Sequence, residues 1–182
     1  MKDRIEILAS GFGGQGVVRL GQIVGVAAVN QGLRVTMLKS HGTEQRGGYV
    51  RTQLVLSADE IDSPLVESPD YFVAMSSAAY QQFGPLVTEG KILYDPDMVS
   101  IDKGKPVEQI AVLAKATAVE KLGRPIYANT VMLGALTGAT DGFMEKENVL
   151  ATMLKIIPKF KEENKKAFEL GYAMTKGTNH VG

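Results

Sequence analysis

Three glycines near the start of the chain lie between two apolar stretches, and this feature most constrains the fold. Gly11, Gly13 and Gly16 have the spacing G-x-G-x-x-G, which is typical of a turn between a strand and a helix that binds a dinucleotide. The apolar run before the turn, residues 4–10, predicts a short strand. Residues 15–30, which are apolar nearly all round, predict a helix covered on most sides. The chain therefore begins with a strand, a glycine turn and a helix.

A second strand is expected at 34–38, after a helix stop at Asn30-Gln31-Gly32. Such a β-α-β unit predicts parallel pairing of the two strands with a right-handed crossover. Further strands are expected at 49–57, 71–75, 91–94 and 107–110, and further helices at 76–83, 111–122, 129–140, 145–157 and 161–176. This alternation over 182 residues predicts a single-domain α/β fold with a largely parallel sheet flanked by helices. We expect the domain to span 1–176 and a flexible tail to span 177–182.

Charge and cysteine content restrict the classes of function. Lys plus Arg and Asp plus Glu both total 20, and this balance argues against a general nucleic-acid binder. The chain has no cysteine, so it offers no thiolates for an iron–sulfur cluster, and its two histidines are a poor basis for a metal site. The uncharged stretch 125–140 is too short to span a membrane. We expect a cytoplasmic protein that contacts neither membrane nor nucleic acid.

The glycine turn allows three interpretations. A helix N-terminus presents free backbone N–H groups and a positive dipole end to an anion. The full dinucleotide motif also places an acid about 20 residues further on, at the end of the second strand, where this chain has Lys39 and Ser40. Close packing of the helix on the sheet, anion binding, and NAD(P) or FAD binding all stay open. The candidate binding residues of the turn are Gly11, Gly13, Gly14, Gln15 and Gly16.

A polar loop, GTEQRGG at 42–48, is the second candidate site. It is either an exposed turn with a solvated ion pair or a binding loop in which Arg46 offers a guanidinium to a carboxylate or phosphate. Because this loop follows the second strand and the glycine turn follows the first, we expect both at the same edge of the sheet. The candidate residues are Glu44, Arg46 and Gly47.

The helix expected at 129–140 is rich in small residues, including Gly134 and Gly138. They indicate either close helix packing inside the domain or a surface that partner proteins cover. Asn129 is expected to cap this helix at its N-terminus. No nucleophile elbow, P-loop or H-E-x-x-H motif is present, so we expect no catalytic residue in this chain.

Five segments, in order, resemble the γ subunit of 2-oxoacid:ferredoxin oxidoreductases. They are GFGGQGVVRLGQIVGVAA, SHGTEQRGGYVRTQLVLS, SPDYFVAM, YANTVMLGAL and KAFELGY. The resemblance spans about residues 4 to 175, nearly the whole chain. The paired segments G-x-G-G-Q-G and E-Q-R-G-G are much more specific than the turn alone.

The resemblance implies a subunit that is inactive alone. The whole enzyme oxidatively decarboxylates a 2-oxoacid with coenzyme A, giving an acyl-CoA and CO2 and reducing ferredoxin. Thiamine diphosphate and the iron–sulfur clusters are expected on α, β and ferredoxin-like δ partner subunits, and coenzyme A is expected near the glycine turn. The amino-acid sequence of the second segment favours a 2-oxoglutarate or branched-chain enzyme over a pyruvate enzyme. A homodimer of the isolated chain is compatible with the sequence, and a stand-alone NAD(P)- or nucleotide-binding protein is the alternative.

Overall fold

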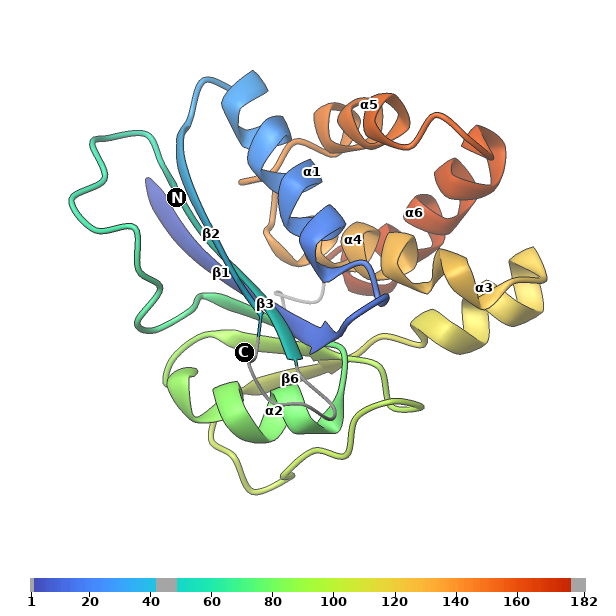
Figure 1. Ribbon diagram of the computed structural model, residues 1–182, viewed down its shortest axis with the longest axis horizontal. Helices are drawn as coiled ribbons and strands as arrows, with labels where there is room; N and C mark the ends of the chain where they lie inside the picture. The colour runs from blue at the N-terminus through green and yellow to red at the C-terminus, as the bar shows by residue number, and fades with distance from the viewer. Residues whose placement is uncertain (1, 42–48, 178–182) are drawn as a thin grey trace.

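A six-stranded sheet forms the middle of the molecule in the computed structural model, which describes residues 2–41 and 49–177 (Figure 1). The strands are β1 (Arg4–Phe12), β2 (Arg34–His41), β3 (Tyr49–Ser57), β4 (Tyr71–Ala74), β5 (Lys91–Tyr94) and β6 (Glu108–Ala111). The helices are α1 (Val17–Asn30), α2 (Ser77–Phe83), α3 (Ala114–Leu122), α4 (Ala128–Ala139), α5 (Lys146–Ile156) and α6 (Lys161–Thr175). The α/β fold class is therefore confirmed, whereas residues 178–182 of the expected tail lie outside the described residues.

The strand order is β2-β3-β1-β4-β5-β6, and β3 runs antiparallel to both of its neighbours. The expected pairing of the second strand with the first is therefore wrong, although the two strands do point in the same direction. The reason is that β2 and β3 are neighbours in sequence and pair as antiparallel strands, which places β3 between β2 and β1. Six of the nine residues of β3 are buried, as suits an interior strand, whereas β2 lies at the edge and none of its residues is buried.

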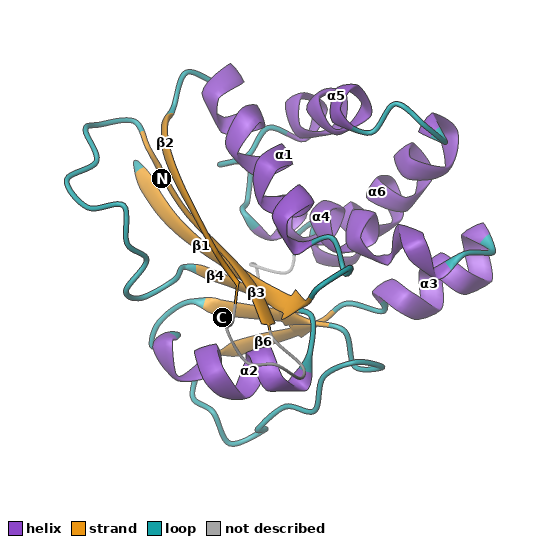
Figure 2. Ribbon diagram, viewed as in Figure 1, coloured by secondary structure: helices purple, strands orange, loops and turns teal. Residues whose placement is uncertain are grey.

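Helices cover the two faces of the sheet unequally (Figure 2). α1, α4, α5 and α6 lie on one face and share the larger apolar core with it, in which Leu20, Leu54 and Phe168 are fully enclosed. α2 lies on the other face over a smaller core that contains Phe72 and Phe83. Burial on both faces explains why β1 and β4 consist largely of apolar residues.

Local signals set most helix ends correctly. The Ser76 hydroxyl accepts a hydrogen bond from the Ala79 N–H at 3.1 Å, which confirms it as the N-cap of α2. Gly32 and Gly123 have positive φ angles of 84° and 72° directly beyond α1 and α3, as helix stops require. The expected cap role of Asn129 is wrong, because α4 begins one residue earlier, after a short 3₁₀ turn at Pro125–Tyr127. Among the described residues, no helix combines the length and apolarity needed to cross a membrane.

The small residues of α4 allow its backbone to touch that of α6. A Cβ atom on Gly134 would overlap the Phe168 carbonyl oxygen, and one on Gly171 would overlap the Val131 carbonyl oxygen. Every residue of α4 from 130 to 139 is buried within this one chain. Packing inside the domain is therefore confirmed for this helix, and the expectation that partners cover it is wrong.

Substitution of two helical glycines by alanine should have opposite effects on stability. Gly171→Ala places a methyl group against backbone that cannot move independently, so we expect a loss of about 3 kcal/mol or more in unfolding free energy. In Gly25→Ala the new methyl group meets only Leu54 and Val35 side chains at 3.4 and 3.6 Å, so the higher helix propensity of alanine should add about 0.5–1 kcal/mol. Urea denaturation measures both, and equal effects of the two substitutions would contradict the backbone contact.

Candidate functional site

The glycine turn joins the end of β1 to the start of α1 with its middle open to solvent. Gly14 and Gly16 have φ angles of 87° and 80°, which other residues adopt only with strain. Apart from the adjacent residues of the chain, no described atom lies within 4 Å of the position that a Cβ would take on Gly13 or Gly14. The backbone here is therefore accessible to a bound group, at the end of a helix whose first N–H groups have no acceptor within the helix.

Gln15 ties this turn to the neighbouring strand. Its Oε1 atom accepts a hydrogen bond from the Phe12 N–H at 2.6 Å, and its Nε2 atom donates to the Met75 carbonyl at 2.8 Å. Gly11 leaves room for this bridge, because a Cβ there would overlap Oε1 of Gln15 and lie 2.8 Å from Cβ of Met75. Gly11 and Gln15 therefore hold the turn against the residue that follows β4.

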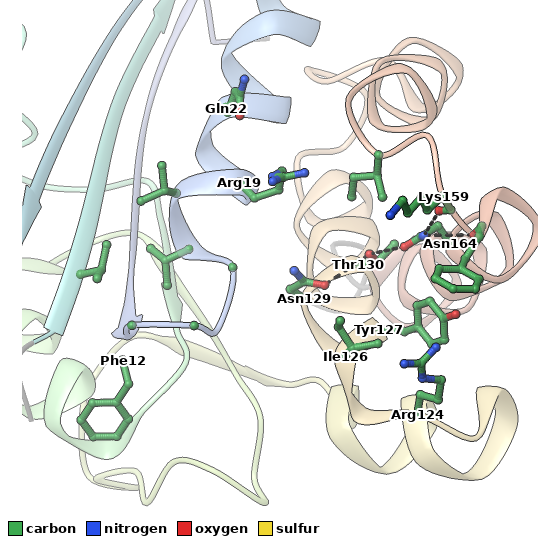
Figure 3. Close-up of a pocket in the computed structure, with 18 of the residues that line it drawn as sticks. Phe12, Arg19, Gln22, Arg124, Ile126, Tyr127, Asn129, Thr130, Lys159 and Asn164 are labelled. Carbon is green, nitrogen blue, oxygen red and sulfur yellow. Dashed lines mark hydrogen bonds between the residues drawn. The ribbon is translucent and has the colours of Figure 1, made fainter.

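Gly16 contacts the start of α4 through Asn129. A Cβ on Gly16 would overlap the Asn129 Nδ2 atom. The Thr130 hydroxyl lies 3.4 Å from the Asn129 amide oxygen and 2.9 Å from that of Asn164 (Figure 3). The amide nitrogen of Asn164 in turn donates to the carbonyl oxygens of residues 159 and 160. Packing of Asn129 against Gly16 and the hydrogen bonds that follow from Asn129 thus connect the glycine turn, α4 and the start of α6.

A cavity of about 740 Å³ lies between the turn, α1, α4 and the start of α6, a size that suits a small-molecule ligand. Its described lining includes three cationic side chains, Arg19, Arg124 and Lys159, and neither Asp nor Glu. Figure 3 shows Arg19 on α1 on one side and Arg124 and Lys159 on the other. Because the described lining residues include no counter-charge, this basic cavity favours a phosphate or carboxylate group.

Phe160 forms part of the rim of the basic cavity. It is 54% exposed and has a φ angle of 53°, which is unusual for a residue other than glycine. The Arg124 guanidinium carbon lies 5.5 Å from the centre of its ring. This contact holds the cation at the mouth of the cavity, with a cation–π attraction of about 0.5–1 kcal/mol at such an exposed position.

The turn residues Gly13, Gly14 and Gly16 line the basic cavity. Glu44, Arg46 and Gly47 lie outside the described residues. The strand before them, β2, ends at this cavity, and the strand after them, β3, begins there. His41 at the end of β2 and Val50 in β3 are paired with each other, and both line it.

Sequence reasoning missed the three cationic residues of the cavity. Arg19, Arg124 and Lys159 come from three separate parts of the chain and belong to no local motif. Pro125 follows Arg124 and Pro158 precedes Lys159, and each proline marks a helix boundary. The residues around each boundary do not indicate that the two boundaries lie close together in the fold.

Comparison with known proteins decides the family. Residues 6–174 match the family model described as pyruvate ferredoxin/flavodoxin oxidoreductase. The chain belongs to this family.

Relatives in the family include subunits of enzymes for different 2-oxoacids. The 2-oxoglutarate synthase subunit KorC of Methanocaldococcus jannaschii is 39% identical over 181 residues, covering 97% of this chain and 96% of the relative. The ketoisovalerate oxidoreductase subunit VorA of Methanothermobacter thermautotrophicus is 36% identical over 168 residues, covering 84% of this chain and 35% of the relative.

Two solved structures share the fold. The γ subunit of a keto/oxoacid ferredoxin oxidoreductase from Geobacter sulfurreducens has a TM-score of 0.83 at 31% identity, covering 94% of this chain and 98% of that one. The 2-oxoglutarate:ferredoxin oxidoreductase of Magnetococcus marinus, with 2-oxoglutarate, coenzyme A and succinyl-CoA bound, has a TM-score of 0.86 at 23% identity and covers 96% of this chain and 31% of that one.

Membership of this family disfavours the alternative of a stand-alone NAD(P)-binding protein. The end of β2 agrees with this, since it carries Lys39 and His41 rather than the acid that binds a ribose in dinucleotide enzymes.

Removal of the Gln15 side chain should loosen the turn without unfolding the chain. We expect Gln15→Ala to lower the unfolding free energy by roughly 1–2 kcal/mol, because two hydrogen bonds of a half-buried amide are lost. Hydrogen exchange of the Phe12 amide should accelerate. Gln22 is an exposed residue in α1, and Gln22→Ala is the matched control. It should change neither the unfolding free energy nor the exchange rate of the Phe12 amide. Unchanged exchange at Phe12 in Gln15→Ala would contradict the bridging role.

Proposed function

We propose that this chain is the γ subunit of a 2-oxoglutarate:ferredoxin oxidoreductase and that it binds the phosphate groups of the substrate coenzyme A. The whole enzyme converts a 2-oxoacid and coenzyme A into an acyl-CoA and CO2 and reduces ferredoxin. Family membership and the near full-length match to KorC support this assignment. The match to VorA makes a branched-chain 2-oxoacid the second candidate substrate.

The basic cavity beside the glycine turn is the observation that carries this proposal. Coenzyme A has a 3′-phosphate and a diphosphate, and guanidinium groups bind phosphate oxygens through paired hydrogen bonds. Arg19 and Arg124 are placed for this role on opposite sides of the cavity, and Lys159 adds a third charge. Gly13 and Gly14 let phosphate oxygens approach the backbone N–H groups at the start of α1.

The loop that contains Glu44, Arg46 and Gly47 belongs to the same proposal. Its flanking residue His41, and Val50 just after it, line the basic cavity. We propose that Arg46 supplies a further cation for coenzyme A or for a carboxylate of a partner subunit.

The chemistry of the reaction belongs to other subunits in this proposal. Thiamine diphosphate stabilises the carbanion formed on decarboxylation, and iron–sulfur clusters carry the electrons to ferredoxin. The chain contains no cysteine to ligate such a cluster. We propose α, β and ferredoxin-like δ subunits as the cytoplasmic partners that hold these groups, while the γ subunit binds and orients coenzyme A.

Loss of a cation from the basic cavity should weaken the binding of coenzyme A without affecting the 2-oxoacid. In the assembled complex we expect Arg124→Ala to raise the KM for coenzyme A about ten- to hundred-fold, because a charged hydrogen bond contributes roughly 1.5–3 kcal/mol. The KM for 2-oxoglutarate should stay unchanged. Arg46→Ala should raise the coenzyme A KM or weaken subunit assembly, with folding intact.

Arg34→Ala is the matched control for these substitutions. Arg34 is an exposed cation at the opposite end of β2, so its removal should leave both KM values unchanged. Steady-state kinetics with 2-oxoglutarate, 2-ketoisovalerate and pyruvate also identifies the preferred 2-oxoacid. A wild-type KM for coenzyme A in each of Arg19→Ala, Arg124→Ala and Lys159→Ala would reject the cavity as the coenzyme A site.

The isolated chain should be inactive. We expect no 2-oxoacid- and coenzyme A-dependent reduction of a viologen dye by the purified chain, because it lacks ligands for redox clusters. Assembly with its partner subunits should restore dye reduction under the same anaerobic conditions. Turnover by the chain alone would refute the subunit assignment, and micromolar binding of NADH or NADPH in a calorimetric titration would favour the nucleotide-binding alternative.

A further inference from the structure

A second hollow of about 420 Å³ lies beside the glycine turn, where Gly14 and Gln15 line it. Met75 follows β4, and Asp95 follows β5 at the same edge of the sheet. Ligands of open α/β sheets bind outside the carboxyl ends of the parallel strands. The hollow therefore occupies a position where a ligand is expected, yet the phosphate site proposed above does not use it.

The hollow and the basic cavity are adjacent. Gly14, Ile126 and Asn129 line both of them. Ile126 is 66% exposed, and Gly14 has open space beside its Cα. An elongated molecule that crosses from one to the other therefore passes over the exposed Ile126 side chain and the open backbone of Gly14.

The chemistry of the hollow differs from that of the cavity. Three methionines, Met75, Met98 and Met132, contribute flexible thioether chains that adapt to an uncharged ligand. Asp95 is only 4% exposed. Its carboxylate accepts hydrogen bonds from the backbone N–H groups of Asp97 at 3.0 Å and Lys115 at 2.7 Å. Among the described lining residues, Asp95 and Lys115 balance in charge in the hollow, whereas the charged side chains of the basic cavity are all cations.

We infer that this hollow binds the uncharged amide arm of the molecule whose phosphates occupy the basic cavity. The inference rests on the proposed function, since it takes coenzyme A as the ligand. The pantetheine arm consists of methylene groups, two methyl groups and two amides, which suits a methionine-lined surface. The difference in charge between the two sites determines the orientation, with the nucleotide phosphates in the cavity and the arm in the hollow.

The test compares coenzyme A with adenosine 3′,5′-bisphosphate, which has phosphate groups but no arm. In calorimetric titrations of the full chain, coenzyme A should bind about tenfold or more tightly than the bisphosphate, because only its arm buries apolar surface. Met98→Trp fills the hollow with a larger side chain at a position that is already 37% exposed. In this variant the affinity for coenzyme A should fall to that for the bisphosphate, while the bisphosphate affinity stays unchanged.

Leu86→Trp is the matched control, because Leu86 is also 37% exposed and does not line the hollow. It should leave both affinities unchanged. Equal affinities of the unmodified chain for the two ligands, or unchanged coenzyme A binding in Met98→Trp, would overturn this inference while the phosphate site stands. That result would leave a side chain of a partner subunit as the occupant of the hollow. Binding of neither ligand would reject the phosphate site as well.

Discussion

The backbone contact between α4 and α6 is the constraint on which the rest of the site depends. Gly134 and Gly171 let the two helices approach until a single added methyl group on either would overlap a carbonyl oxygen of the other helix. This contact sets the position of the start of α6, and with it Lys159 and Phe160, relative to the start of α4. At the start of α4, Thr130 contacts Asn164 of α6, and Asn129 packs against Gly16 of the glycine turn. The position of the turn relative to α6 is therefore fixed through α4. A site assembled from three helices thus depends on residues that bear no charge and contact no ligand.

The glycines of the turn differ in what surrounds them. Gly11 and Gly16 make room for Gln15 and Asn129, so they are structural glycines. Gly13 and Gly14 leave the backbone open at the cavity, so they are the ones suited to a ligand. A dinucleotide motif without its ribose-binding acid is therefore consistent with a fold that offers phosphate binding to a different molecule, and function follows from the site rather than from the turn alone.

The sequence predicted individual helices and strands, but it did not predict which strands pair with each other. Ser76 capped its helix as expected, and β3 has the expected bounds, because capping and strand patterns depend on nearby residues. The insertion of β3 between β1 and β2 was missed, since a strand pattern does not state which strand it will pair with. The start of α3 was placed three residues too early, because Ala111 belongs to β6, where it pairs with Tyr94, a residue distant in sequence.

The sequence by itself determined the strand–turn–helix at the glycines, the absence of cluster ligands and, through its ordered motifs, the resemblance to the γ subunits. Only the tertiary structure decided that Arg19, Arg124 and Lys159 surround one cavity, whose described lining residues include no Asp or Glu. More than a hundred positions separate the first of these residues from the other two. Their meeting follows from the packing of α1 and α4 on one face of the sheet and of α6 on α4, and such long-range packing leaves no signal in the residues next to each charge.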